Sequence, residues 1–426
     1  MDGADVIGSA NRFSPLWNTS FKYNLHREDF MKKLSWLHEL AFRVSYGYTG
    51  SIDKRALPFN VLYYNIASTF FNTLIPSHID AKNPSVKWQQ KEDRSFGLDA
   101  AFFKGRLRAS VNYYNNVTRN LMDQKTLPIS VGINSIEYNN SSVRNSGWEL
   151  NFYSSNVQTK DFRWVTTFNF SLNRSKVLKS YYKSVQDIPK GYEKTEPVEG
   201  TSTNSWLGYR FAGIDPLTGH TLALVDNMGR DVPIGFQRED GSWVLDMDEA
   251  NETEKLKIKQ TIGNSYPPVS GGFGMMFSWK RLTLNTRFAF MAGHQITSSY
   301  YSVAGAGSIS SVSKNAVCKE MERWRKPGDV TDIPGYNVTG QTSSLQMDWY
   351  DRKLETGNYL KCQEISLSYV LPSACCKKLL LESCRVNLNV RDIFTLSRYK
   401  GPDPENFGAF QYPIPRRFVL SLSVGI

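Results

Sequence analysis

Hydrophobic and polar residues alternate with a period of two along much of the chain. The pattern is clear over residues 40–49, 163–172 and 418–426, where apolar side chains occupy every second position. Alternation of this kind predicts β-strands with one apolar face and one polar face. The segments that carry it are 16–25, 40–49, 95–102, 107–115, 148–154, 163–172, 271–278, 282–291, 360–371, 385–391 and 418–426. The sequence therefore predicts an all-β chain of about eleven long strands.

Short and long connections alternate between these strands. Phe103–Arg106 and Trp279–Arg281 read as tight hairpins, and residues 155–162 and 372–384 also form short links. Between them lie long connections, at 50–94, 116–147, 173–270, 292–359 and 395–415. This order is typical of outer-membrane barrels, which have brief turns on one side of the membrane and long loops on the other. A soluble β-sandwich has no reason to place every long loop at one end, and such loops are unusual in a compact soluble domain.

Strand length and aromatic placement agree with a membrane barrel. Predicted strands of about nine to eleven residues match a tilted strand that crosses a bilayer. Aromatic rings favour the headgroup level of a membrane, and many here lie near predicted strand ends, although ordinary core and surface aromatics of a β-protein remain the alternative. These residues are Trp17, Tyr23, Tyr46, Tyr48, Tyr113, Tyr114, Trp148, Trp164 and Trp279.

Composition narrows the class further. Lys and Arg number 51 against 40 Asp and Glu, so the net charge is 51 − 40 = +11, but the cations are scattered and nucleic-acid binding is not expected. An aromatic content of 13% excludes intrinsic disorder, and no run of about 18 apolar residues predicts a transmembrane helix. The five cysteines form no CxxC pair, which favours incidental thiols or one opportunistic disulfide.

The chain offers little that points to catalysis. Its five histidines lie far apart and form no HExxH motif, and Gly271–Gly274 lies at the start of a predicted strand rather than a nucleotide-binding turn. The acidic stretch Asp246–Glu252 is similar to a calcium loop, but it lacks the glycine at position six and has Lys257 at position twelve. A solvated loop is therefore expected there, with a bound cation as the alternative. We predict no enzyme, no cofactor, no metal and no specific site residues.

Eight segments, in family order over nearly the whole chain, resemble the SusC/RagA family of TonB-linked outer-membrane receptors. They are FMKKLSWLHELAFRVSYGYTGS from Phe30, NPSVKWQQKEDRSFGLDAAFFKGRLRASVNYYNNVTRNLM from Asn83, RNSGWELNF from Arg144, LGYRFAGIDPLTG from Leu207, RWRKPGDVTDIPGY from Arg323, GNYLKCQEISLSYVLP from Gly357, RVNLNVRDIFTLSRYKGPDPE from Arg385 and YPIPRRFVLSLSVGI from Tyr412.

The resemblance implies an antiparallel transmembrane β-barrel of the TonB-dependent receptor type in the outer membrane of a Gram-negative bacterium. It implies import of oligosaccharides or peptides, with a SusD-like surface lipoprotein as a lid and the TonB complex as the source of energy.

The chain departs from the family pattern in several ways. No signal peptide, TonB box or plug is recognisable, and residues 1–426 resemble only the C-terminal portion of the barrel. About eleven strands are predicted where such transporters have about 22. An odd number of strands cannot close as a normal bacterial barrel, and unpaired edges are not viable in lipid. Ile426 also stands where the family usually ends in an aromatic residue. We therefore interpret the chain as a truncated or split open reading frame.

Two functions remain open from the sequence. The first is nutrient import by part of a TonB-dependent receptor. The second is a non-transporting β-rich binding or structural protein, soluble or surface-associated, derived from a receptor. Substrate contacts would come from the lumen and from loop aromatics, each of which is expected more often to pack within its own loop than to touch ligand. These aromatics are Tyr63, Tyr64, Trp206, Trp243, Trp324 and Trp349.

Overall fold

A computed structural model describes most of the chain. The described residues are 2–3, 7, 11–53, 60–66, 74–80, 83, 85–127, 130, 135–188, 197–225, 235–298, 321–335, 350–378, 380–406 and 412–425. Among them, no helix has the length and apolar character needed to cross a membrane, a result that does not bear on β-barrels. The fold is all-β, as the alternation predicts.

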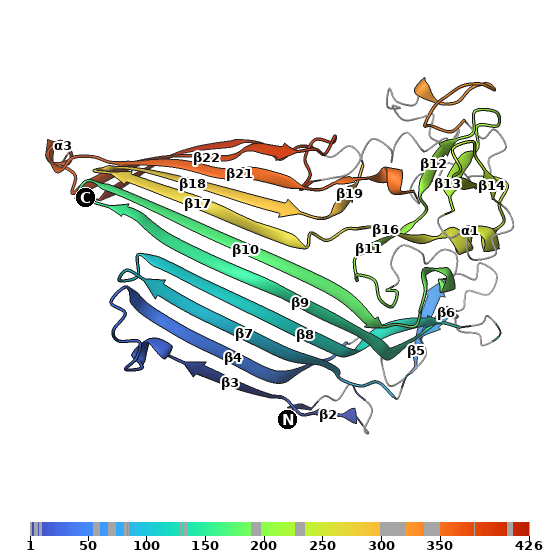
Figure 1. Ribbon diagram of the computed structural model, residues 1–426, viewed down its shortest axis with the longest axis horizontal. Coiled ribbons are helices and arrows are strands. Elements are labelled where there is room, and N and C mark those ends of the chain that lie inside the picture. The colour runs from blue at the N-terminus through green and yellow to red at the C-terminus, as the bar shows by residue number, and fades with distance from the viewer. Residues whose placement is uncertain are drawn as a thin grey trace. The chain divides into compact units, whose positions relative to one another are not determined.

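One sheet of eleven strands dominates the structure (Figure 1). Neighbours in this sheet follow one another in chain order, with β3 and β23 at its two ends, and among the described residues these two strands do not pair with each other. The eleven strands are β3 (Trp17–Tyr23), β4 (Leu37–Ser51), β7 (Gln89–Phe102), β8 (Leu107–Thr126), β9 (Ser135–Gln158), β10 (Phe162–Lys179), β17 (Val269–Trp279), β18 (Leu282–Ala292), β21 (Tyr359–Val370), β22 (Ser383–Ser397) and β23 (Arg417–Gly425). Each predicted strand is therefore confirmed, and so are the hairpins after β7 and β17.

Several strands are longer than predicted. β8 has 20 residues and β9 has 24, so most of the predicted connection 116–147 is strand and that prediction is wrong. The apolar alternation stops where the side chains become polar on both faces. The backbone can continue to pair beyond that point, because ladder hydrogen bonds do not depend on apolar side chains. β8 and β9 are therefore longer than the alternating stretches from which membrane-spanning strands are predicted.

Short elements occupy the connections. The strands are β1 (Asp2–Gly3), β2 (Phe13–Ser14), β5 (Val61–Ile66), β6 (Leu74–Asp80), β11 (Ser205–Gly208), β12 (Phe211–Ile214), β13 (Thr221–Leu224), β14 (Phe236–Gln237), β15 (Trp243–Asp246), β16 (Gln260–Asn264), β19 (Gln295–Thr297) and β20 (Leu354–Thr356). The helices are α1 (Glu252–Ile258) and α3 (Ser373–Lys378), with 3-10 turns η2 (Leu25–Arg27), η4 (Val185–Asp187) and η8 (Asp351–Lys353).

The chain divides into two compact units. Unit 1 comprises Met1–Leu150, Asn173–Ser184 and Pro197–Thr203. Unit 2 comprises Asn151–Leu172, Val185–Glu196 and Asn204–Ile426.

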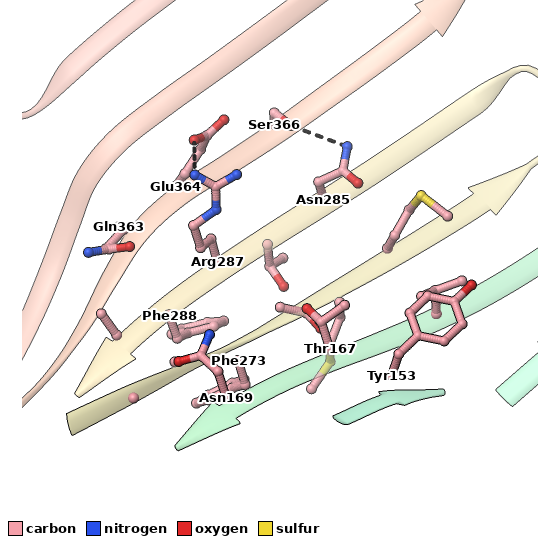
Figure 2. Close-up of a pocket in the computed structure, with 18 of the residues that line it drawn as sticks. Tyr153, Thr167, Asn169, Phe273, Asn285, Arg287, Phe288, Gln363, Glu364 and Ser366 are labelled. Carbon is pink, nitrogen blue, oxygen red and sulfur yellow. Dashed lines mark hydrogen bonds and ion pairs between the residues drawn. The ribbon is translucent and has the colours of Figure 1, made fainter. Parts of the chain in front are cut away.

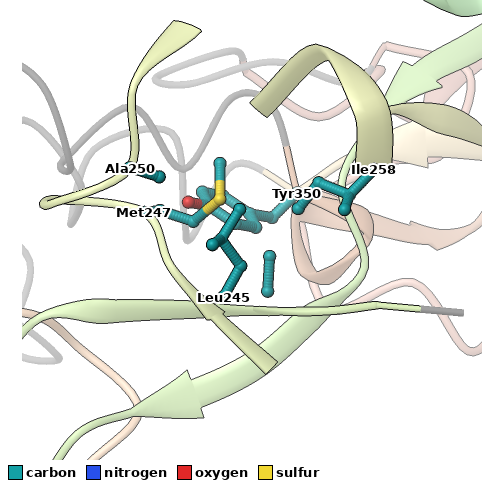
Figure 3. Close-up of a cluster of buried hydrophobic side chains, with 6 residues drawn as sticks. Leu245, Met247, Ala250, Ile258 and Tyr350 are labelled. Atoms are coloured by element: carbon teal, nitrogen blue, oxygen red, sulfur yellow. The ribbon is translucent and has the colours of Figure 1, made fainter. Parts of the chain in front are cut away.

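Unit 2 also contains a small four-stranded sheet with a buried apolar core, which the sequence did not predict. The strands β12, β13, β15 and β14 pair in that order within the connection 173–270. Helix α1 follows, and its N-cap residue is Asn251, whose side chain forms a reciprocal capping box with Glu254. The core side chains lie together in Figure 3 and are Ala223, Leu245, Met247, Ala250, Ile258 and Tyr350. The described part of this connection therefore forms a small subdomain, whose buried apolar cluster is completed by Tyr350 from the connection 292–359.

Candidate functional site on the polar face of the sheet

Strand register separates the main sheet of unit 2 into two chemically different faces. Paired residues on neighbouring strands lie on the same face, and the faces alternate along each strand. One row across the sheet is wholly apolar and consists of Trp164, Phe277, Leu284, Leu367, Leu388 and Leu420. The next row lies on the other face and consists of Arg163, Ser278, Thr283, Ser368, Asn387 and Ser421.

The apolar face is not covered by protein at its C-terminal strand. Phe418 is 72% exposed and Leu420 is 74% exposed. A sheet that buries its apolar face in a soluble core would hide such side chains, because each contributes about 1.5–3 kcal/mol when buried. Their exposure is the arrangement expected of a surface that faces lipid.

Unit 1 shows the same division. Phe21, Val44 and Phe96 pair across β3, β4 and β7, while the adjacent row contains Lys22 and Arg43. The Arg43 guanidinium Nε lies 2.7 Å from the Asp99 carboxylate on the polar face. Rings also cluster where girdles were predicted, since Trp17, Tyr46 and Tyr48 are in mutual contact.

A hollow of about 630 Å³ lies on the polar face of unit 2 (Figure 2). It is lined from β9, β10, β17, β18 and β21. Its floor consists of small residues, because Gly272, Gly274 and Ala289 occupy the polar face where larger side chains would fill the space. A Cβ added to Gly272 would lie 2.7 Å from the Phe288 carbonyl oxygen, so this position requires glycine.

Charged and amide side chains surround the floor. Arg287 Nη1 lies 3.7 Å from Glu364 Oε2, and the amide of Asn285 donates to Ser366 Oγ at 3.4 Å (Figure 2). Arg163 donates to the hydroxyl of Tyr153 at 3.3 Å. These groups can bind a polar or charged ligand through hydrogen bonds and ion pairs.

A second hollow of about 700 Å³ adjoins the first on the same face. Both are lined by Asn285 and Ser366, and the second extends across β22 to Arg385 and Arg391. The two hollows therefore form one continuous polar surface over β10, β17, β18, β21, β22 and β23.

Two of the loop tryptophans named as possible ligand contacts have structural roles. Trp206 donates from Nε1 to the Gln295 carbonyl oxygen at 3.1 Å. Trp324 donates from Nε1 to the Pro216 carbonyl oxygen at 2.9 Å. Each indole N–H thus joins two connections that are distant in sequence.

The remaining loop aromatics differ in exposure or lie outside the described residues. Tyr63 is exposed, and Trp243 is half-buried in β15. The side chain of Tyr64 and the whole of Trp349 lie outside the described residues.

The acidic stretch Asp246–Glu252 joins the end of β15 to the start of α1, with Glu249 and Glu252 exposed and Met247 and Ala250 buried. Asp246 accepts a hydrogen bond from the backbone N–H of Asp248 at 2.9 Å, and Asp248 accepts one from the N–H of Thr221 at 3.0 Å. His220 Nδ1 lies 2.9 Å from Asp246 Oδ2. These contacts link the stretch to the start of β13.

His220, Asp246 and Asp248 offer ligand atoms within 4.8 Å of one another, the one such group among the described residues. Burial by itself would lower the pKa of His220. The hydrogen bond to Asp246 and the surrounding carboxylates outweigh that effect and raise the pKa. The raised pKa and the 2.9 Å contact are those of an ion pair between protonated His220 and Asp246.

The cysteines form no disulfide among the described residues, and the glycine run is part of a strand. Cys362, Cys375, Cys376 and Cys384 are free thiols, and Cys318 lies outside the described residues. Gly271–Gly274 lies within β17, as predicted.

The chain was compared with known proteins. No family model matches. A curated relative, TonB-dependent receptor P3 of Formosa agariphila, is 24% identical over 414 residues, which cover 95% of this chain and 39% of the relative. TonB-dependent receptor SusC of Bacteroides thetaiotaomicron is 22% identical over 448 residues, covering 99% of this chain and 41% of the relative.

A solved structure of the RagAB peptide importer in a closed-closed state aligns with a TM-score of 0.80 at 25% identity. The alignment covers 99% of this chain and 44% of that one. The chain thus spans about two fifths of the length of the curated relatives it matches.

Proposed function

The chain resembles TonB-dependent receptors of the SusC/RagA family, and from this premise we propose that it forms part of an outer-membrane receptor for nutrient import. The expected resemblance is confirmed, and the outer-membrane location agrees with it. Residues 1–426 would correspond to the C-terminal portion of the barrel. Its relatives are named as receptors and an importer, so the proposed activity is binding and passage rather than catalysis.

The division of the sheet into two faces carries this proposal. The exposed apolar face fits contact with lipid, and the hollowed polar face fits the wall of a wet passage. In such a receptor the rest of the barrel wall would pair with β3 and β23, the two ends of the sheet. Unpaired edges would otherwise leave backbone groups without partners in the membrane.

The relatives support a proposal for the substrate and the partners. One neighbour is described as a peptide importer, and another relative is SusC. We infer uptake of oligosaccharides or peptides with a SusD-like surface lipoprotein, driven by the TonB complex. The small β12–β15 sheet lies between β10 and β17 in the chain. It is therefore at the end of these strands where the long connections lie, and α3 is at the other end (Figure 1). A lipoprotein lid would meet the receptor at that end.

Cell fractionation tests the proposal. When the chain is expressed with an export signal in a Gram-negative host, together with a complementary receptor segment that supplies the strands to pair with β3 and β23, we expect it to sediment with the outer membrane and to require detergent for extraction. A matched variant with the lipid-facing Leu420 and Leu422 changed to Ser should be recovered less in that fraction. The alternative, a non-transporting β-rich soluble or surface protein, predicts a monodisperse protein without detergent. That outcome would exclude the receptor.

A further inference from the structure

The polar face of unit 2 carries a marked excess of positive charge. The charged residues in the paired stretches of its six long strands are the cations Arg163, Arg287, Lys361, Arg385, Arg391 and Arg417 and the anions Glu364 and Asp392. Strand register places all of them except Asp392 on the polar face. Asp392 lies in a bulge, and its ion pairs to Lys361 and Arg417 place it on the same face. Their balance is 6 − 2 = +4, or +3 when Glu405, which pairs with Lys361, is included.

The carboxylates lie behind the guanidinium groups. The side chains of Glu364 and Asp392 are 19% and 13% exposed, whereas that of Arg287 is 68% exposed. The side chains of Arg391 and Arg417 are also exposed, at 50% and 60%. A ligand that approaches this face therefore meets cations first.

Glu364 neutralises its neighbours only in part. Its Oε2 lies 3.7 Å from Arg287 Nη1 and 4.0 Å from Arg391 Nε, and both distances exceed those of a hydrogen bond. Its Oε1 instead accepts from the Asn389 amide at 2.5 Å. One carboxylate is thus shared between two arginines, whose N–H groups can still bind another anion.

The two hollows place these cations on either side of neutral hydrogen-bonding groups. Arg287 lines the first hollow and Arg391 the second, with Asn285 and Ser366 shared between them. Phe273 and Phe288 belong by register to the apolar face, so Tyr153 provides the aromatic side chain on the polar side. The surface therefore offers amides, hydroxyls and guanidinium groups, rather than the aromatic platforms on which sugar rings stack.

We propose that this polar face recognises acidic peptides. The proposal rests on the import function proposed above and specifies the substrate class of the same face. An Arg guanidinium binds a carboxylate through two parallel N–H···O bonds, and Asn, Ser and Thr side chains match the donors and acceptors of a peptide backbone. A peptide with several Asp or Glu side chains would offset the positive charge along the row formed by Arg287, Arg391 and Arg417.

Fluorescence anisotropy with the full chain in detergent micelles tests this assignment. The probe is a labelled peptide of alternating Glu and Gly, compared with a Gln/Gly peptide of the same length and with oligogalacturonate. We expect the Glu/Gly peptide to bind on the order of tenfold more tightly than the other two at low salt, with the difference falling as salt rises.

Three variants identify the residues. R287Q combined with R391Q should reduce affinity for the Glu/Gly peptide on the order of tenfold. R281Q removes one positive charge from the hairpin between β17 and β18, outside both hollows, and should leave binding unchanged. E364Q keeps an acceptor for Asn389 but removes the competing carboxylate, so it should tighten binding by about threefold. A gain of affinity cannot come from misfolding.

Equal binding of the Glu/Gly and Gln/Gly peptides, or equal losses from R281Q and the double variant, would overturn the proposal. Oligogalacturonate binding as tight as that of the Glu/Gly peptide would overturn the restriction to peptides. A chain that fractionates with the outer membrane but fails these tests would leave the import function standing.

Discussion

At the scale of the residue, the pKa of His220 depends on the carboxylates around it. Its ion pair with Asp246 raises its pKa despite burial, so the pair stabilises the fold fully below the unfolded pKa of about 6.5. That contribution is lost as pH rises through the folded pKa. We expect protection factors of the Ala223 and Leu245 amides, corrected for intrinsic exchange, to fall by the equivalent of about 1 kcal/mol or less over this range. Hydrogen exchange measured by mass spectrometry checks this.

Controls separate the ion pair from a bound cation. His220→Gln should abolish the pH dependence, whereas His38→Gln, on β4 of unit 1, should leave it unchanged. Addition of EDTA should not alter the protection factors. A clear loss of protection on chelation would instead make His220, Asp246 and Asp248 a cation site.

Residue roles in the connections could not be predicted, because their partners are remote in sequence. Trp206 binds a carbonyl 89 positions away and Trp324 one 108 positions away. Alternation places Arg287 and Glu364 on polar faces, but only strand register brings the two side chains together. The polar lumen was therefore expected, whereas the charged hollow was not.

At the scale of the element, the hairpin after β17 depends on an unusual backbone conformation. Lys280 has φ of 50°, the left-handed region that β-branched residues rarely adopt. We expect Lys280→Val to lower the free energy of unfolding by about 1–2 kcal/mol. Lys280→Gly also removes the charge and the contact with Trp279 but relieves the backbone, so it should be near neutral. Urea unfolding in detergent measures both, and equal losses would contradict a backbone origin.

The floor of the hollow on β17 gives a second prediction. A methyl group at Gly272 would lie 2.7 Å from the Phe288 carbonyl oxygen in the neighbouring strand. Gly272→Ala should therefore destabilise the sheet by about 1–3 kcal/mol in the same unfolding assay, as overpacking does elsewhere. Ser270→Ala, on the same strand and face, is the matched control and should change stability by less. A neutral Gly272→Ala would show that the floor tolerates a side chain.

Strands were predicted more successfully than connections. A period of two identifies the eleven strands because each has an apolar face, but it cannot follow β8 and β9 once both faces become polar. The small sheet was missed because its strands are short, four residues or fewer. One signal for α1 was present, since Asn251 followed three residues later by Glu254 is a capping-box pattern.

At the scale of the whole molecule, the proposal of a membrane receptor depends on which face of the sheet meets lipid and which meets water. Each face is continuous across six strands of unit 2, and unit 1 repeats the division. An exposed apolar face beside a polar, cationic one fits a wall between lipid and water. The net charge of +11 and the low mean hydropathy of −0.42 agree with this arrangement, because the lumen and loops carry the polar residues.

Adjacent residues of β23 test that assignment directly. Leu420 lies on the apolar face and Ser421 on the polar face, at neighbouring positions of one strand. In co-folding with the complementary barrel segment into lipid vesicles, followed by urea titration, Leu420→Arg should cost about 2–4 kcal/mol, the penalty of a charge near the middle of a bilayer. Ser421→Arg adds the same side chain toward water and should cost much less. Equal penalties would contradict the membrane assignment, and a larger penalty at Ser421 would reverse the two faces.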